Sequence, residues 1–215
     1  MKLFLDSGDL DEIQEAYRWG VIDGITSNPK LIQANWKGGN REFLKAIGKL
    51  GRKDTVIVTL ESHDPDRLVR EAKEIAAVYP DVVIKLYMTK DDLAIIKELK
   101  KCNIAAHISL IYSVNQAFLA AKAGAAIVSP FIGRADDFGC DGIQHLKDIL
   151  RMVTQYGFDT EVMAASIRHP YHVREAILCG TPIVTLPFPV LEKMFHHPAT
   201  DVGVKDFLDS ANKKG

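Results

Sequence analysis

The stretch Val82-Val83-Ile84-Lys85-Leu86-Tyr87-Met88 is a short apolar run with one lysine inside it. Because it is apolar at successive positions, it predicts a strand buried on both faces, as in a parallel sheet. A charge inside such a strand is costly unless it is paired or has lost its proton. Burial lowers the pKa of a lysine, and a neutral amine attacks carbonyl carbons. The alternative is a lysine at the strand end whose long stem reaches water.

Similar apolar runs recur along the chain, with amphipathic stretches between them. Together with 82–88 they cover 3–6, 24–27, 56–60, 105–110, 126–132, 162–166 and 183–187. Strands that alternate with helices form a parallel sheet. Eight such units in 215 residues favour a compact (β/α)8 TIM barrel, with one extra C-terminal helix around Asp206-Phe207-Leu208. A doubly wound open sheet is the competing architecture.

Cap residues predict where several helices begin and end. Thr89 is placed to cap one helix, and Asp92 three residues later completes a capping box. Pro170 predicts the first turn of another helix, and Gly180 predicts its end. The 30–50 segment is predicted to be a longer connection between a strand and a helix.

Length, charge and cysteines exclude several classes of protein. The 215 residues fit a single domain, 1–215, with a sizeable core. A formal charge of −1, with basic residues mixed among acidic ones, predicts no nucleic-acid partner. Three cysteines far apart predict free thiols in a reducing compartment. No signal peptide and no apolar run of membrane length is evident, so we expect a cytoplasmic protein with no membrane partner.

Functional side chains of a TIM barrel lie at the C-terminal ends of its strands. In this chain those positions carry an amine, two carboxylates, an amide, several hydroxyls, an imidazole and two guanidinium groups. They are Asp6, Thr26, Asn28, Thr59, Glu61, Lys85, His107, Ser109, Ser129, Arg134, Ser166 and Arg168. No histidine pair has metal-ligand spacing and no glycine-rich phosphate loop is present, so neither a metal nor a nucleotide site is predicted.

Two arginines predict a phosphate site. Arg134 closes the sequence 129–134 at the exit from one strand, and Ser166-Ile167-Arg168 closes the next strand just before Pro170. Two guanidinium groups, a hydroxyl and a nearby helix N-terminus together bind an anion well. The alternative is that either arginine pairs with Asp136 or Asp137 on the rim of the barrel.

Three other polar residues each allow two interpretations. Asp6 is either a general acid or base near the lysine or a helix cap, although Asp9 is better placed to cap. Asn28 precedes Pro29, so it is either a turn residue or a donor to a substrate hydroxyl. His107 shares a strand face with Ser109 and points toward the mouth. The histidines in predicted helices or loops are expected at the surface, namely His63, His169, His172, His196 and His197.

These residues stand in motifs that resemble the transaldolase family, in its small-subunit subgroup with the fructose-6-phosphate aldolases. The matching stretches are Leu5-Asp6, Gly24-Ile25-Thr26-Ser27-Asn28-Pro29, Ile84-Lys85, the helix 116–124, the segment 128–137, the segment 164–168 and His197-Pro198. The resemblance covers essentially residues 1–209. It implies a barrel that needs no cofactor and that assembles as a homo-oligomer of five or ten subunits.

The resemblance also implies roles for individual residues. Lys85 would form a Schiff base with a ketose carbonyl, and Asp6 would take the C4 hydroxyl proton as the C3–C4 bond breaks. Substrate hydroxyls would be held by Asn28, with Thr26 beside it in the same motif. The pocket lining would include Ser129 and Phe131, and the sugar phosphate would be bound by Arg134, Ser166 and Arg168. Phenylalanine at position 131 is typical of the transaldolases, whereas the aldolases usually carry tyrosine there.

Three positions depart from the family pattern around the amine. Thr59 stands where the family usually has Glu or Gln to position a catalytic water, and Glu61 two residues later shares its strand face. The fifth strand reads His107-Ile108-Ser109 instead of Asn-x-Thr, and Tyr87 replaces a proline. We hypothesise that His107 has taken over part of the proton transfer; the alternative is that it only binds substrate hydroxyls. An unperturbed histidine titrates near pH 6.5, so the hypothesis predicts a titration of turnover around pH 6–7.

The function predicted from these observations is transfer of a dihydroxyacetone unit from a ketose phosphate, such as fructose 6-phosphate, to an aldose phosphate, such as glyceraldehyde 3-phosphate. One alternative is a direct aldolase, or an enzyme acting on another anionic ketose. Another is a sugar-phosphate-binding protein without efficient chemistry. Because the departures surround the amine while the arginines match the family, phosphosugar binding is predicted more firmly than the reaction.

Overall fold

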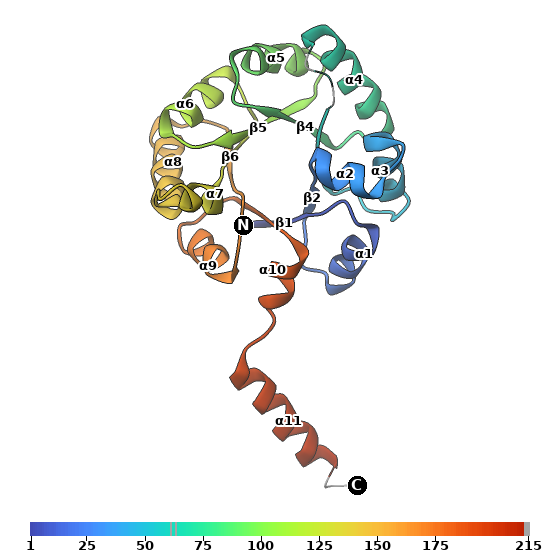
Figure 1. The fold of residues 1–215 in the computed structure, drawn as a ribbon, viewed down its shortest axis with the longest axis vertical. Coiled ribbons are helices and arrows are strands. Elements are labelled where there is room, and N and C mark those ends of the chain that lie inside the picture. The colour runs from blue at the N-terminus through green and yellow to red at the C-terminus, as the bar shows by residue number, and fades with distance from the viewer. Residues whose placement is uncertain (61, 63, 213–215) are drawn as a thin grey trace.

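The computed structural model describes residues 1–60, 62 and 64–212. Its strands are all parallel and close into a barrel in chain order, with the helices outside it (Figure 1). The strands are β1 (Lys2–Asp6), β2 (Gly24–Thr26), β3 (Thr55–Thr59), β4 (Val82–Tyr87), β5 (Ala105–Ile111), β6 (Ile127–Pro130), β7 (Glu161–Ala164) and β8 (Ile183–Leu186). The closed barrel confirms the (β/α)8 prediction over the open sheet.

The helices lie between consecutive strands and after the last one. They are α1 (Leu10–Trp19), α2 (Pro29–Asn35), α3 (Gly39–Gly48), α4 (Pro65–Val78), α5 (Lys90–Lys101), α6 (Val114–Ala123), α7 (Ile132–Asp137), α8 (Gly142–Tyr156), α9 (Pro170–Leu178), α10 (Phe188–Lys193) and α11 (Pro198–Asn212). The long connection predicted at 30–50 contains both α2 and α3. Within the described part of the chain, none of these helices is long and apolar enough to cross a bilayer.

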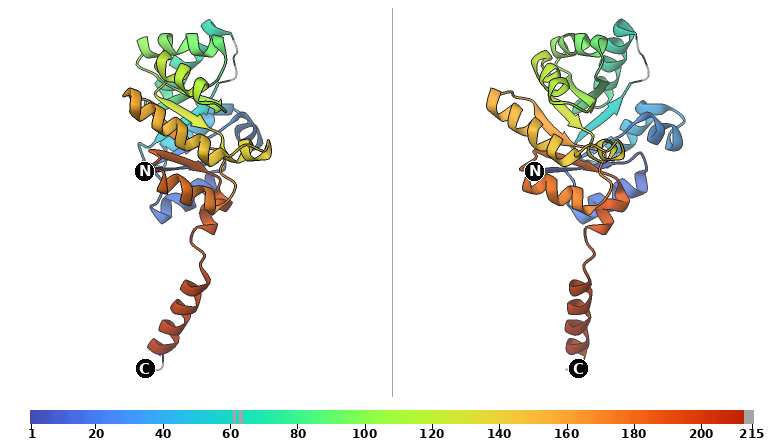
Figure 2. Two further views of the ribbon diagram at one scale, coloured as in Figure 1. Left: turned by 90° about the vertical axis from the view of Figure 1, so that its left-hand side faces the viewer. Right: turned by 60° about the vertical axis from the view of Figure 1, so that its left-hand side comes forward.

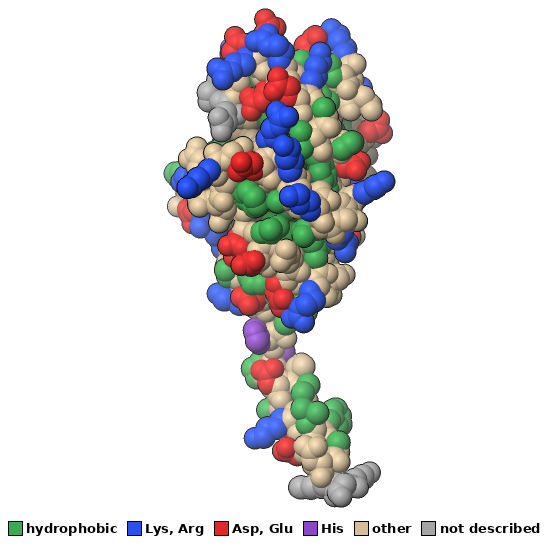
Figure 3. Space-filling view, turned by 90° about the vertical axis from the view of Figure 1, so that its right-hand side faces the viewer, with side chains coloured by type: hydrophobic (Ala, Val, Ile, Leu, Met, Phe, Trp, Pro, Cys, Tyr) green, Lys and Arg blue, Asp and Glu red, His purple; other side chains and the backbone are tan. Residues whose placement is uncertain are grey.

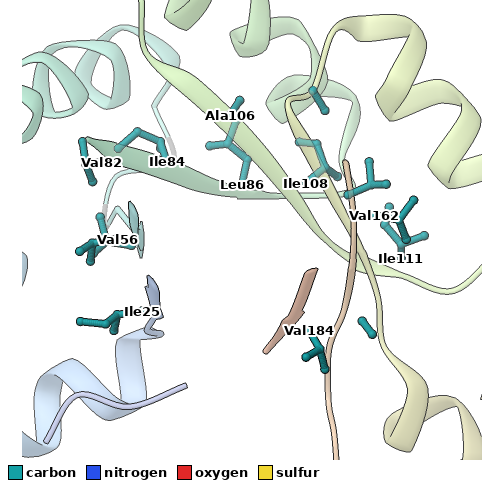
Figure 4. Close-up of a cluster of buried hydrophobic side chains, with 14 of the residues drawn as sticks. Ile25, Val56, Val82, Ile84, Leu86, Ala106, Ile108, Ile111, Val162 and Val184 are labelled. Atoms are coloured by element: carbon teal, nitrogen blue, oxygen red, sulfur yellow. The ribbon is translucent and has the colours of Figure 1, made fainter. Parts of the chain in front are cut away.

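Alternate residues of the strands belong to two separate hydrophobic cores. Side chains that face the surrounding helices form the larger core, which includes Val56, Ile84 and Leu86 (Figure 4). Side chains that face the barrel axis form a smaller core made of Phe4, Ile57, Val83, Ile127, Met163 and Ile183. Because both faces are buried, the strands are apolar at successive positions, as predicted from the sequence.

The polar layer of the barrel begins two residues beyond this inner core. Side chains at i and i+2 share a strand face, so the residue two positions after each inner core residue also faces the axis. Five of the six pairs end in a polar residue, namely Phe4 and Asp6, Ile57 and Thr59, Val83 and Lys85, Ile127 and Ser129, and Ile183 and Thr185, while Met163 is followed by Ala165. The inner core therefore closes the N-terminal half of the barrel and leaves a polar cavity at the C-terminal half.

One glycine makes room for the largest inner side chain. A Cβ at Gly24 would lie 2.6 Å from Cζ of the Phe4 ring. Phe4 is opposite Gly24 in the register of β1 and β2. The absence of a side chain on β2 therefore lets the Phe4 ring fill the barrel directly below Asp6 and Thr26.

The predicted cap residues lie at helix ends, but the capping box at Thr89 forms only in part, because the Thr89 amide donates to the carbonyl oxygen of Tyr87 and not to Asp92. The Thr89 hydroxyl accepts a hydrogen bond from the Asp92 amide (3.1 Å), and the Asp92 carboxylate accepts one from the Tyr87 amide (2.7 Å). The carboxylate thus holds the end of β4, two residues beyond Lys85. Gly180 follows α9 with φ of 72°, a left-handed conformation that favours glycine.

The extra C-terminal helix is also present, and it projects away from the barrel (Figures 1 and 2). None of its residues is buried. Val204, Phe207 and Leu208 follow helical spacing and are 52–79% exposed. Hydrophobic side chains are visible on this projecting segment in Figure 3.

Candidate active site

The predicted site residues line a single cavity of about 660 Å³ at the C-terminal ends of the strands. Those that do so are Asp6, Thr26, Asn28, Thr59, Lys85, His107, Ser109, Ser129, Phe131, Arg134, Ser166 and Arg168. Glu61, the remaining candidate, and His63 lie outside the described residues. The barrel closure explains this grouping, because residues far apart in the sequence occupy equivalent positions on neighbouring strands.

Lys85 lies in the middle of a row of side chains across three strands. In the sheet register it is opposite Thr59 on β3 and opposite His107 on β5. Its ammonium nitrogen donates a hydrogen bond to the carbonyl oxygen of Ser27 at 2.5 Å. Burial lowers the pKa of Lys85, and the negative charge of Asp6 opposes this shift. The amine therefore points into the cavity and not into bulk water, which favours the nucleophile over a lysine that extends to solvent.

Asp6 is held by a short chain of hydroxyl groups. Thr26 Oγ1 donates to Asp6 Oδ1 at 2.8 Å and lies 2.6 Å from Thr185 Oγ1. Because the single hydrogen of the Thr26 hydroxyl goes to Asp6, Thr185 is the donor in the second contact. The capping role weighed for Asp6 belongs to Asp9, whose side chain accepts from the amides of residues 11 and 12 in α1. Asp6 is thus oriented through one oxygen, and its other oxygen remains available to a ligand.

His107 is fully enclosed beside the lysine. Its Nε2 lies 2.7 Å from Ser129 Oγ, and that hydroxyl donates onward to Ser109 Oγ at 3.4 Å. In the tautomer with the proton on Nε2, His107 donates to Ser129 and the hydroxyl of Ser129 is free to donate to Ser109. Burial, and to a lesser extent the charge of Lys85, lowers the pKa of His107 well below 6.5. The premise of an unperturbed imidazole, on which the expected titration of turnover at pH 6–7 rested, is therefore wrong.

Two polar atoms on either side of Lys85 have no protein partner. Both Nδ1 of His107 and the hydroxyl oxygen of Thr59 are buried, and neither makes a hydrogen bond to any described residue. Buried polar atoms are almost always paired with protein, water or ligand. These two atoms are therefore unsatisfied polar groups on the two strands that flank Lys85.

The predicted anion cradle is assembled from the ends of β6 and β7. The main-chain amide of Arg134 donates to Ser166 Oγ at 3.2 Å, and its guanidinium lies 5.0 Å from the centroid of the Phe131 ring. The Arg168 guanidinium pairs with Asp137 at 2.7 Å, so the alternative of a rim ion pair applies to this arginine. Both members of that pair are more than half exposed, and exposed pairs contribute little stability. Arg168 can therefore leave Asp137 and bind an anion without a large loss of folding stability.

Close backbone contact holds the two halves of this cradle together. The amides of Ile132 and Gly133 donate to the carbonyl oxygens of Ala165 (2.9 Å) and Ser166 (3.0 Å). A Cβ at Gly133 would lie 2.4 Å from Cγ of Arg168 and 2.5 Å from the Ser166 carbonyl oxygen. Position 133 therefore requires glycine. Ser166 itself has φ of 59°, a conformation in which non-glycine residues are uncommon.

Asn28 has a local structural role, and its position in the cavity is compatible with the second interpretation, a donor to substrate. Its Oδ1 accepts from the amides of Lys30 (3.1 Å) and Leu31 (3.2 Å), so it caps α2. The residue also lines the cavity. The cap uses the oxygen of the carboxamide and leaves its nitrogen as a donor for a ligand.

Sequence reasoning missed two features of the site and misplaced a third residue. Thr185 lines the cavity and supports Thr26, and its position two residues after Ile183 in β8 was the available signal. The Ser27 carbonyl that accepts from Lys85 is a main-chain atom without a residue-specific signal. His172 was expected at the surface, but it is only 5% exposed because it packs beside Asp136 of α7. The prediction holds for His169, His196 and His197, which are exposed.

Metal chemistry has no ready ligand set among the residues that the structure describes. No group of three or more His, Cys, Asp or Glu side chains in this part of the chain is arranged to hold a metal ion. The chemically distinctive groups of the cavity are the amines of Lys30 and Lys85, a carboxylate, an imidazole and two guanidinium groups.

Comparisons with known proteins place this cavity in a family. Residues 3–214 match the family described as Transaldolase/Fructose-6-phosphate aldolase. A probable transaldolase of Kosmotoga olearia is 46% identical over 209 residues, which cover 97% of this chain and 95% of the relative. Probable transaldolases of Methanococcus vannielii and a Thermoanaerobacter species are 42% and 41% identical, with at least 96% of each chain covered. The chain belongs to the transaldolase/fructose-6-phosphate aldolase family.

Proposed function

We propose that this protein is a Schiff-base transaldolase, which moves a dihydroxyacetone unit from a ketose phosphate such as fructose 6-phosphate to an aldose phosphate. The observation that carries the proposal is the buried Lys85 amine, which shares one cavity with Asp6 and with the Arg134 and Arg168 side chains. The family and the names of its relatives support the transaldolase type of activity.

Imine formation would begin with attack of the neutral Lys85 amine on C2 of the ketose. The carbinolamine that forms loses water to give a protonated imine, which serves as the electron sink. The lowered pKa of Lys85 supports this step, because a larger fraction of the amine is unprotonated. No cofactor is required, since the imine itself accepts the electrons of the bond that breaks.

Cleavage of the C3–C4 bond would use Asp6 as the general base. Its carboxylate takes the proton of the C4 hydroxyl, the C3–C4 electrons move into the imine, and an aldose phosphate leaves. The hydrogen bond from Thr26 to Oδ1 supports this role, because it orients the carboxylate and leaves Oδ2 for the substrate. Attack of the enamine on the acceptor aldehyde reverses the step, and Asp6 returns the proton.

The water of imine formation and hydrolysis would be handled by the row Thr59, Lys85 and His107. We assign to His107 the transfer of the proton that accompanies this water. The imidazole acts in its neutral form with Nδ1 as the acceptor, while Nε2 contacts Ser129, which in turn contacts Ser109. Nδ1 of His107 and the Thr59 hydroxyl support the assignment, because neither makes a hydrogen bond to a residue that the structure describes. Binding of substrate hydroxyls by His107 is the alternative.

Substrate selection would rest on the cradle of Arg134, Ser166 and Arg168, which binds the sugar phosphate, while Asn28, Thr26, Ser129 and Phe131 contact the sugar. We further place the protein in the cytoplasm, in the pentose phosphate branch of carbohydrate metabolism. We also propose a homo-oligomer, of five or ten subunits by resemblance to the family. The projecting α11, with its exposed apolar side chains, supports assembly.

A transfer assay tests the proposed reaction. Removing three carbons from fructose 6-phosphate leaves a three-carbon aldose phosphate, so a four-carbon acceptor, erythrose 4-phosphate, makes the product distinguishable. We expect a seven-carbon ketose phosphate by mass spectrometry, formed at a rate that depends on the acceptor. Release of the triose phosphate at the same rate without acceptor would instead establish a direct aldolase. The absence of both reactions would contradict the proposed activity on fructose 6-phosphate.

A further inference from the structure

We propose that His172 is a positioning residue of the phosphate site, where it links Asp136 of α7 to the main chain of Arg168. This inference rests on the proposed function, because it assumes that Arg168 binds the substrate phosphate. His172 lies in the first turn of α9, outside the cavity, and none of the roles above uses it.

The contacts of His172 form a bridge between two elements. Its Nε2 lies 3.1 Å from Asp136 Oδ2, and its Nδ1 accepts a long hydrogen bond of 3.4 Å from the main-chain amide of Arg168. The other carboxylate oxygen of Asp136 accepts from the amide of Gly142 at the start of α8 (2.9 Å). Asp136 is thus fixed by α8, and through His172 it fixes the residue that carries the guanidinium.

The arrangement works as a helix cap supplied from inside the helix. His169, the N-cap residue of α9, makes no side-chain cap hydrogen bond. His172, three residues later, instead reaches back to the amide of Arg168, much as the Glu of a capping box reaches back. The main chain just before Arg168 has an unusual conformation at Ser166. An anchor immediately after that turn therefore restricts where the Arg168 side chain can go.

Only one form of the imidazole can make both contacts. A main-chain amide can only donate, so Nδ1 must be without a proton and Nε2 must carry one. Burial and the neighbouring ring of His169 lower the pKa of His172, with a smaller effect of Arg168 in the same direction, while Asp136 opposes them. The neutral imidazole with its proton on Nε2 satisfies the geometry. The two contacts also give a reason why His172 is buried, although a surface position was expected from the sequence.

Two substitutions separate the halves of the bridge. The Oδ1 atom of asparagine occupies roughly the place of histidine Nδ1, whereas the Nε2 atom of glutamine occupies roughly the place of histidine Nε2. His172→Asn therefore keeps the acceptor for the Arg168 amide and loses the Asp136 contact. His172→Gln keeps a donor for Asp136 and loses that acceptor. Both variants remove the same ring, which makes each a control for the other.

The experiment measures binding of glucitol 6-phosphate, which has no carbonyl and cannot form a Schiff base, by calorimetry to the full chain. Loss of one hydrogen bond of about 1 kcal/mol predicts an approximately fivefold weaker affinity for His172→Gln and less than about twofold for His172→Asn. Arg168→Ala is the reference for loss of the phosphate contact, and unphosphorylated glucitol is the reference for the rest of the cavity. Thermal unfolding of each variant reports its fold.

The outcomes distinguish the two proposals. Weaker binding in Arg168→Ala and His172→Gln, with near-normal binding in His172→Asn, supports the positioning role. Two outcomes overturn the positioning role and leave the phosphate site supported. One is weaker binding in Arg168→Ala together with normal binding in His172→Gln. The other is an equal loss of affinity in both His172 variants. Equal binding of glucitol 6-phosphate by the parent protein and Arg168→Ala contradicts the phosphate site itself. Nitrogen-15 chemical shifts of His172 in the unsubstituted protein add a test that needs no variant, because a proton on Nδ1 would exclude the bridge.

Discussion

Nε2 of His107 lies 2.7 Å from the hydroxyl of Ser129, one strand away from the Lys85 amine. In the tautomer that donates to Ser129, Nδ1 is the basic nitrogen of the imidazole, and Nδ1 has no partner among the described residues. Burial, and to a lesser extent the charge of Lys85, lowers the pKa of this imidazole well below its usual range. The imidazole is therefore in the form that can accept a proton, and the lowered pKa makes it a weaker base than a free histidine.

The role of His107 in proton transfer predicts a specific coupling with Thr59. His107→Asn should lower kcat by roughly 10²-fold, the usual size of a general-base contribution, because Asn cannot accept a proton near neutral pH. Adding Thr59→Glu should restore part of kcat, and steady-state kinetics of the four proteins give the coupling energy. A neutral or faster His107→Asn protein would mean that the imidazole only binds hydroxyls. Glu61 would then be the next candidate for this proton transfer.

The buried histidines predict how stability depends on pH. His107 and His172 both have pKa values lowered by burial in the folded protein. Below about pH 6.5 the unfolded chain takes up protons that the folded chain does not, so the free energy of unfolding falls as pH falls. Each histidine contributes a slope of at most about 1.4 kcal/mol per pH unit. Urea unfolding gives the free energy of unfolding at pH 7.5 and at pH 5.5. The difference between these two values should be smaller for His107→Asn than for the parent protein at equal concentration. An equal difference in the two proteins would contradict the buried neutral form.

The arginines of the cradle predict selective loss of phosphorylated substrates. Arg134→Ala or Arg168→Ala should raise KM for fructose 6-phosphate about tenfold or more, since a charge-assisted hydrogen bond contributes roughly 1.5–3 kcal/mol. The KM for unphosphorylated fructose should change much less. Asp137→Asn is a matched control, because it removes the ion pair with Arg168 and leaves the Arg168 side chain in place. Equal losses for both sugars would show that the arginines are structural.

The projecting α11 predicts that assembly requires the C-terminal segment. A chain truncated after His197 removes the exposed apolar residues Val204, Phe207 and Leu208 without removing any buried residue of the barrel. We expect light scattering after gel filtration to show an oligomer for the full chain and a smaller species for the truncated chain. Replacing Phe207 and Leu208 with Ser should have the same effect. An unchanged mass in both variants would contradict a role of α11 in assembly.

Much of the fold could be predicted because local signals and burial agree. Strands apolar on both faces require a layer of helices, and Thr89 with Asp92 identifies a helix start from four residues alone. The cavity residues could also be predicted, because strand ends such as Lys85 and Arg134 share one face of a barrel. This inference needs only strand boundaries accurate to about two residues.

What could not be predicted depends on partners that are distant in the sequence. His172 is buried because Asp136, 36 positions earlier, comes to lie beside it when α7 and α9 pack. The pKa of His107 is set by its enclosure and by Lys85, neither of which periodicity describes. Main-chain groups such as the Ser27 carbonyl and the positive φ of Ser166 depend on the folded loops.

The central claim is that Lys85 is the nucleophile. Lys85→Met removes the amine while filling a similar volume, so the variant should keep the circular dichroism spectrum and lose turnover. Asp6→Asn is a matched control, because it removes the general base while leaving the amine. We expect it to form the imine but not to cleave the C3–C4 bond.

The most direct test is trapping of the imine with borohydride in the presence of fructose 6-phosphate. Intact mass and peptide mapping should show one sugar-derived adduct per chain, located on Lys85 and absent from Lys85→Met. An adduct on a different lysine, or no adduct on a protein that turns over its substrate, would contradict the account.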